Sequence, residues 1–319
     1  MAPGPATDVN GGRGVFSRVL RIPLEPTDPV VEPDPSIPPT VVAKLPIPGP
    51  NGDAARGSGA YRREALAYRR LLPSSPVASP TVHAVTEDAD GTTLLLEDLT
   101  GHRAVDQLDG LGADDALAVV AELAALHAHW RHRPEPDALG VRRSTPSALP
   151  PAGLAAGLVA LRQRWAGDID ERWLPTFEAM VAGRARLVET FAAAPSPTLC
   201  HGDPRADNLV FEATDDGRPV LFDWQQLAVQ AGEADVAWMA ATSLTVEDRR
   251  AVDDRLLAAY GTDVDRYRVG LILPGLAVLL LAQRRATDER TTRFIATSID
   301  RIGAAITDYE VPALAATAR

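Results

Sequence analysis

The sequence predicts an α+β fold, in which a small antiparallel sheet precedes a larger and mainly helical region. Strand-like runs of β-branched or alternating apolar residues are concentrated before residue 100. After residue 110, apolar residues instead recur at the spacing of amphipathic helices. The chain has 319 residues and is 45% hydrophobic, which is enough to bury a core in one large domain or in two lobes.

The N-terminal region is predicted to contain one sheet and one helix. Residues 40–45, T-V-V-A-K-L, form a β-branched strand, and residues 60–72 have the apolar periodicity of a helix. A hairpin follows over residues 81–99. Two stretches are predicted to be irregular because they are rich in proline or glycine: residues 23–39, interpreted as an exposed loop that cannot be a central strand, and residues 46–59.

Helices are predicted for most of the remaining chain. Their expected ranges are 113–130, 154–165, 174–191, 246–260 and, as about three helices, 265–305. In the first of them the spacing predicts a core face, made of Leu117, Val120, Ala121, Ala124 and Ala128. Residues 131–151 are basic and proline-rich and are interpreted as a loop insertion.

Three histidines lie near the end of the first of these helices. His127, His129 and His132 are two and three positions apart, so their side chains converge poorly at a helix end. A packing or surface role is therefore favoured over a metal site.

The most informative stretch runs from residue 198 to residue 224. It reads T-L-C-H-G-D-P-R-A-D-N-L-V-F, then a D-D-G turn, then P-V-L-F-D-W. Two short apolar runs beside the turn predict a β-hairpin. Asp203 and Asn208 precede this hairpin and Asp223 follows it, so we expect the three side chains to lie close together. Carboxylate and amide oxygens are ligands that Mg²⁺ takes together with substrate phosphates, which predicts phosphate chemistry.

The segment H-G-D-x-x-x-x-N, followed by a strand-borne Asp, resembles the catalytic segment of the aminoglycoside phosphotransferase and choline kinase superfamily. The runs E-D-L, L-A-A-L-H-A-H-W and H-G-D-P-R-A-D-N are similar to its ecdysteroid-kinase-like branch. The resemblance implies a bilobal protein-kinase-like fold, with an N-lobe over residues 1–97 and a C-lobe over residues 98–319. An isolated H-G-D occurs by chance, and a lone Asp after a strand is usually a turn former, but the full ordered set favours the catalytic interpretation.

The resemblance also implies roles for the residues of the catalytic segment. Asp203 would orient the acceptor hydroxyl, and Asn208 and Asp223 would hold Mg²⁺ on the phosphates. Asp235, in G-E-A-D-V-A-W, would brace the catalytic loop through hydrogen bonds, although a carboxylate at a helix start is also favoured by the helix dipole. His201 is interpreted as a packing residue of the loop.

Nucleotide binding is assigned by the same resemblance to the N-terminal region, with ATP or GTP as the donor. Lys44 would contact the phosphates and Glu64 would hold it; the alternative is an edge-strand lysine and a surface glutamate. The same resemblance assigns base contacts to the main chain of the hinge between the lobes, at Glu97 and Leu99. Separately, glycines let the backbone approach phosphate, so residues 10–17, with Gly12 and Gly14, are a candidate nucleotide-covering loop, and a flexible lead-in is the alternative.

The composition of the chain limits which binding partners and which cellular location are expected. The net charge of −11 argues against a nucleic-acid partner and is compatible with a cationic substrate. The single cysteine, Cys200, excludes an intramolecular disulfide and is interpreted as a core residue. No secretory leader or membrane-spanning run is recognised, since the apolar residues 269–282 are too short a run and contain a proline. A cytoplasmic monomer or homodimer is expected.

The predicted function is transfer of the γ-phosphate of a nucleoside triphosphate to a hydroxyl of a small molecule, with antibiotics and other natural products among the candidate acceptors. The Asp223 motif reads D-W-Q and leads directly to a helix, without the long activation segment on which a protein substrate docks. Two alternatives stay open: a non-catalytic nucleotide-binding pseudokinase, and a metal-dependent phosphoester hydrolase that uses His201 and Asp203.

Overall fold

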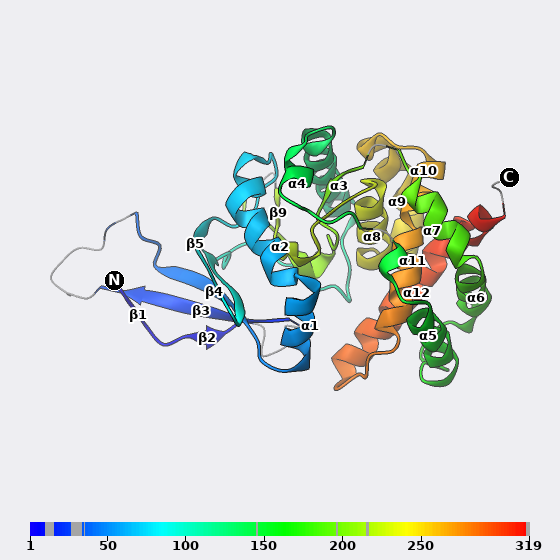
Figure 1. Ribbon diagram of the computed structural model, residues 1–319, viewed down its shortest axis with the longest axis horizontal. Coiled ribbons are helices and arrows are strands. Elements are labelled where there is room, and N and C mark those ends of the chain that lie inside the picture. Colours follow the sequence, from blue (N-terminus) through cyan, green and yellow to red (C-terminus); the bar gives the residue numbers. More distant parts are fainter. Residues whose placement is uncertain are drawn as a thin grey trace. The chain divides into compact units, whose positions relative to one another are not determined.

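Figure 1 shows the computed structural model of the chain, which describes residues 1–9, 16–26, 34, 36–144, 146–195, 197–214 and 217–316. The predicted α+β architecture is confirmed, with an antiparallel sheet toward the N-terminus and helices after it. The chain forms two compact units, Met1–His102 with Glu212–Leu227 and Arg103–Phe211 with Ala228–Arg319. Among the described residues, no helix combines the length and the apolar character that crossing a membrane requires.

The first unit is built on an antiparallel sheet. β3 (Ser17–Glu25) pairs with β4 (Thr40–Pro46), β4 pairs with β6 (Gly91–Glu97), and β6 pairs with β5 (Val82–Asp88), which is the predicted hairpin. Two short strands, β1 (Ala2–Pro3) and β2 (Thr7–Asp8), also pair with β3. The register places Lys44 of β4 between Val19 and Leu94, so the lysine lies on an inner strand.

The prediction of an exposed loop from residue 23 onward is wrong at its start, because β3 continues to Glu25. Pro23 has no amide hydrogen, but it pairs with Thr40 and its carbonyl accepts a hydrogen bond of 2.8 Å from the Gly4 amide. The Leu24 amide donates to the Pro39 carbonyl at 2.8 Å. A strand tolerates a proline when neighbouring groups complete its hydrogen bonds in this way.

The irregular segment predicted over residues 46–59 is also wrong, because a helix, α1 (Pro50–Ser58), forms there. Pro50 occupies the first turn, where a helix needs no amide hydrogen. Gly59 ends the helix at φ 72° and donates to the carbonyls of Ala55 and Arg56. Proline and glycine therefore mark the ends of this helix and do not prevent it.

The predicted helix over residues 60–72 is present as two segments. The first is α2 (Ala60–Leu66), which carries Glu64 on its buried side. The second is η1 (Ala67–Leu71), in which the chain widens to a π-helical turn.

The second unit is mainly helical. Its longer helices are α3 (Ala113–Trp130), α5 (Pro151–Gln163), α6 (Leu174–Ala182), α7 (Arg184–Ala192), α8 (Glu233–Ser243), α9 (Val246–Tyr260), α10 (Val264–Gly270), α11 (Ile272–Leu281) and α12 (Glu289–Asp308). Short strands β7 (Thr198–Cys200) and β10 (Ala228–Gln230) pair antiparallel, and β8 (Leu209–Phe211) follows β7. α8 is the central helix, since nearly all its residues are buried and it packs against α3, α9, α10, α11 and α12.

The predicted core face of α3 is wrong, although both ends of the helix are as predicted. Of the expected residues only Val120 is buried, whereas Ala121 and Ala128 are exposed. The observed buried face consists of Ala116, Val119, Val120, Leu123, Leu126, His127 and Trp130. Alanine, leucine and valine occur all around this helix, so its packing against α8, α9 and β7, and not its sequence, selects the face.

One predicted helix is interrupted, and one predicted loop contains helical turns. Residues 174–191 form α6 and α7, separated at Gly183, where a Cβ atom would lie 2.6 Å from the Cβ atom of Ala315. The basic segment 131–151 contains the short helix α4 (Glu135–Ala138) and a 3₁₀ turn, η3 (Pro146–Ala148).

Helix packing in the second unit predicts a strong effect at one glycine. A Cβ atom at Gly157 of α5 would lie 2.2 Å from the Leu279 carbonyl oxygen of α11. Gly157→Ala should therefore lower the free energy of unfolding by about 1–3 kcal/mol, measured by urea denaturation. Gly57→Ala is the matched control, because nothing lies within 4 Å of its Cβ position, and it should be neutral or stabilising by up to about 1 kcal/mol. Equal effects of the two substitutions would contradict this packing.

Candidate active site

The H-G-D loop begins where β7 ends, and Asp235 of α8 holds its first residues. The Asp235 Oδ2 atom accepts from the His201 amide at 2.7 Å, and Oδ1 accepts from the Gly202 amide at 3.0 Å. Gly202 has φ 86°, a left-handed conformation that favours glycine. Asp235 and His201 are fully buried, so loss of the carboxylate would leave buried amides without acceptors. This is the kind of contact expected of a loop-bracing residue.

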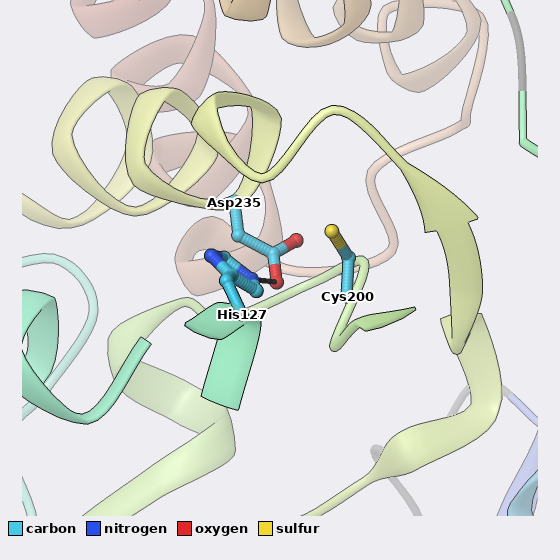
Figure 2. Close-up of side chains that lie close together, drawn as sticks. All are labelled: His127, Cys200 and Asp235. Atoms are coloured by element: carbon cyan, nitrogen blue, oxygen red, sulfur yellow. Dashed lines mark hydrogen bonds and ion pairs between the residues drawn. The ribbon is translucent and has the colours of Figure 1, made fainter. Parts of the chain in front are cut away.

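Asp235 also lies beside His127 and Cys200, and Figure 2 shows the three side chains together. Their ligand atoms all lie within 4.8 Å of one another, a separation that would permit a metal ion. The chemistry does not favour one. Both Asp235 oxygens already accept hydrogen bonds, and Oδ2 lies 3.2 Å from His127 Nε2. Burial raises the pKa of the Cys200 thiol well above its usual value, so the sulfur stays protonated and is a poor metal ligand.

The predicted acceptor-orienting residue, Asp203, is held from two sides. The indole Nε1 of Trp238 donates to its Oδ1 atom at 2.7 Å, and Nδ2 of Asn208 donates to its Oδ2 atom at 3.0 Å. Arg205 Nε lies 3.6 Å from Oδ2, and its guanidinium stacks over the ring of Phe294 at 5.4 Å. Sequence reasoning did not assign a role to Trp238. Its position three residues after Asp235 on the same helix was the available signal, because residues at that spacing share a face.

The end of α8 and a neighbouring loop anchor the rest of the segment. The Ala206 amide donates to Ser243 Oγ at 2.9 Å, and the Asp207 amide donates to Gln107 Oε1 at 3.3 Å. Gln107 is itself buried and donates to the Thr242 carbonyl. α8 therefore supports the loop at its start through Asp235 and at its end through Ser243.

In the first unit, Lys44 is placed between two carboxylates. Its Nζ atom lies 2.7 Å from Glu64 Oε1 and 2.8 Å from Asp223 Oδ1. Burial lowers the pKa of Lys44, but attraction to Asp223 and Glu64 outweighs it, and the net shift is upward. Burial raises the pKa of Glu64, against the attraction of Lys44. We take the pair as charged, because Glu64 lies in direct hydrogen-bond contact with a protonated lysine.

Asp223 has a strained backbone and lies on a segment that is tied to the sheet. Its φ of 62° is rare outside glycine, and such strain is common at functional positions. Gln225 Nε2 donates to Ser17 Oγ at 3.0 Å, and Arg63 Nε donates to the Gln225 carbonyl at 2.8 Å. The segment that contains Asp223 is therefore fastened to β3 and α2.

The remaining assigned residues are placed as follows. The Glu97 amide donates to the Thr81 carbonyl at 2.8 Å, and the Leu99 carbonyl accepts from the His102 amide at 3.0 Å, so these two hinge groups already have partners. Gly12 and Gly14 lie outside the described residues. Asp203 and Asn208 belong to the second unit and Asp223 to the first, so the convergence of these three side chains stays a prediction.

Comparison with known proteins identifies the family. The model of the phosphotransferase enzyme family, APH, matches residues 19–269. The chain belongs to this phosphotransferase family. No curated protein matches its sequence.

Solved structures similar to this phosphotransferase share its fold at low sequence identity. A choline/ethanolamine kinase family protein from Mesorhizobium loti is 15% identical with a TM-score of 0.58, over 98% of this chain and 92% of that one. An ethanolamine kinase from Plasmodium vivax is 12% identical with a TM-score of 0.56, over 97% and 83%. A complex of the aminoglycoside phosphotransferase APH(2")-IIIa with GDP and kanamycin is 13% identical with a TM-score of 0.55, over 88% and 85%. The kinase-like fold is thus shown, while the ecdysteroid-kinase-like resemblance stays a prediction.

The environment of Cys200 gives a direct chemical test of this site. The thiol is fully buried and its pKa is raised, so it should react with a thiol reagent at pH 8 at least about a hundredfold more slowly in the folded protein than in denaturant. Reaction with 5,5′-dithiobis(2-nitrobenzoate), followed by absorbance, measures both rates. Rapid labelling of the folded protein would show that the cluster of His127, Cys200 and Asp235 is open or charged differently.

Proposed function

We propose that this phosphotransferase moves the γ-phosphate of ATP or GTP to a hydroxyl group of a small molecule. The observation that supports it best is the orientation of Asn208. Its Nδ2 atom donates both to the Asp203 main-chain carbonyl, at 2.8 Å, and to the Asp203 carboxylate, at 3.0 Å. Reversing the amide would place its oxygen against two acceptors, so the hydrogen bonds determine this orientation.

This orientation suits a metal ligand. With both amide hydrogens directed to Asp203, the Asn208 oxygen remains to coordinate a cation, and oxygen is the ligand that Mg²⁺ prefers. Asp223 would supply the second protein ligand, a carboxylate that is 36% exposed and lies 2.8 Å from Lys44 Nζ. When bound, Mg²⁺ would neutralise part of the negative charge on the donor phosphates.

Asp203 positions the acceptor. Its two oxygens accept hydrogen bonds from Trp238 and Asn208, so the carboxylate is held in one orientation, in which it would align the acceptor hydroxyl. Phosphoryl transfer has a loose transition state, in which alignment of the nucleophile matters more than the strength of the base. A carboxylate whose orientation is set by two hydrogen bonds can align the acceptor hydroxyl in this way.

Lys44 binds the donor phosphates. Glu64 keeps its ammonium group in place in a buried setting, and Asp223 lies on its other side. Because the ammonium remains protonated there, it offers a positive charge to the phosphates without a change of protonation state.

The acceptor is proposed to be a hydroxylated cation, such as an aminoglycoside or an amino alcohol. The net charge of −11 favours a positively charged partner over a negatively charged one. Kanamycin is bound in one of the structural neighbours, and others are named ethanolamine or choline kinases, so these compounds are the first to test.

Nucleotide consumption tests the function. The protein is incubated with Mg-ATP or Mg-GTP and a panel of aminoglycosides, amino alcohols, nucleosides, macrolides and sugars, and product is identified by mass spectrometry. With the true acceptor, Asp203→Ala should lower kcat by about 10²- to 10⁴-fold, because it removes the group that aligns the hydroxyl. Near-normal turnover by this variant would contradict the assignment. Phosphoester cleavage without nucleotide would favour a hydrolase, and nucleotide binding without turnover a pseudokinase.

Trp238 gives a second, finer test. Trp238→Phe keeps an aromatic ring but removes the hydrogen bond to Asp203, and hydrogen bonds to charged groups are worth about 1.5–3 kcal/mol. We expect kcat to fall about ten- to a hundredfold with KM for the nucleotide unchanged. Trp165→Phe is the matched control, because it removes an indole hydrogen bond of 2.8 Å to the Ala282 carbonyl and should leave kcat unchanged. Equal kcat values for the two variants would exclude a positioning role.

A further inference from the structure

A second concave site lies in the helical unit, and none of its residues is assigned to donor or acceptor binding. It is a pocket of about 390 Å³ where the end of α3, the start of α8, the end of α9 and α10 meet. Arg131, His132, Glu233, Tyr260 and Arg266 are among the residues that line it, and two alanines of α3 complete one wall. Its volume is within the range of about 300–1,000 Å³ typical of small-molecule sites.

The charge of this pocket is positive. Glu233 is buried and engaged, since Arg266 lies 2.7 Å from its Oε1 atom and Thr262 donates to the same oxygen at 3.2 Å. Arg131 has no such partner: within the described part of the chain no carboxylate pairs with it, and its buried Nε atom has no acceptor. The whole chain carries −11, so a concave site with an uncompensated arginine does not follow from its overall charge.

The position of Arg131 at the end of α3 does not by itself explain why this arginine has no carboxylate partner among the described residues. A cation there is favoured by the helix dipole. The dipole, however, offsets a full positive charge only in part. An oxyanion in the pocket would pair with the guanidinium, which matches carboxylate and phosphate oxygens in two hydrogen bonds.

Tyr260, the other polar side chain of the pocket wall, already has a hydrogen-bond partner. Tyr260 and His127 Nδ1 are 2.8 Å apart, and His127 Nε2 faces the Asp235 carboxylate, which can only accept. The Tyr260 hydroxyl is therefore engaged by His127. Burial raises the pKa of Tyr260, so the phenol stays neutral. The cationic side chains are thus the groups that would determine which ligand binds.

We propose that this pocket binds a small oxyanion, either a carboxylate or a phosphate carried by a metabolite, through the Arg131 guanidinium with His132 and Arg266 alongside. The inference rests on residues of the helical unit alone and does not depend on the proposed phosphotransfer. Its wall is connected to the H-G-D loop, since Tyr260 contacts His127 and His127 contacts Asp235.

Titration with inorganic phosphate and with citrate at constant ionic strength, followed by calorimetry, tests the proposal. Lys44→Met protein is used beside the wild type, so that anion binding at the assigned nucleotide lysine is not counted. Saturable binding of at least one anion to both proteins is expected, and the tighter of the two identifies the class. Absence of saturable binding to Lys44→Met protein would overturn the proposal.

Two substitutions locate the binding. Arg131→Gln should weaken it at least tenfold, whereas Arg255→Gln removes the same charge from an exposed position of α9, where the nearest carboxylate oxygen is 3.7 Å away, and should leave it unchanged. Ala128→Glu places a negative charge on the exposed α3 wall of the pocket and should abolish binding without disturbing the core. Wild-type affinity in both Arg131→Gln and Ala128→Glu would overturn the proposal.

Discussion

The helical unit depends on one buried carboxylate. Asp235 accepts hydrogen bonds from the His201 and Gly202 amides and faces His127 Nε2, and it is fully buried. An ionised group in such a setting is tolerated only when nearly all its hydrogen-bonding capacity is used, so these donors must stay where they are. The catalytic loop is consequently held to the central helix α8. Trp238 and Ser243 of the same helix then determine where the Asp203 carboxylate and the Ala206 amide lie.

The sheet unit also depends on a buried charged group that is held by its partners, but here the group is positively charged. Lys44 lies on an inner strand, where an unpaired ammonium would be costly, and Glu64 and Asp223 make it acceptable. Glu64 comes from a helix and Asp223 from a segment that returns to the sheet from later in the sequence. Hydrogen bonds of Gln225 to Ser17 and Arg63 secure that return. Lys44 is therefore positioned by its two carboxylate partners, one of which, Asp223, has a strained backbone.

Hydrogen bonds link the catalytic loop to the proposed anion pocket. Tyr260 forms part of the pocket wall and contacts His127, which in turn contacts Asp235. The approach is close, since a Cβ atom at Gly232 would lie 2.2 Å from the Tyr260 hydroxyl and 2.8 Å from His127 Nδ1. Gly232, which precedes α8, is therefore needed for Tyr260 and His127 to come into contact. The start of the central helix is thus in contact with residues of both the catalytic loop and the proposed anion pocket.

The sequence by itself determined the fold class, the hairpin of β5 and β6, the limits of α3 and α9, and the residues of the H-G-D motif. These features can be predicted because hydrophobic period, turn-forming residues and motif spacing are local properties of the chain. It did not determine α1, the extension of β3 through Pro23, the break at Gly183 or the buried face of α3. Those depend on which elements pack together, and a proline, a glycine or an all-apolar helix fits more than one arrangement. For the same reason only the tertiary structure paired Trp238 with Asp203 and placed Arg131 in a pocket where no carboxylate of the described residues pairs with it, since both features depend on residues distant in the sequence.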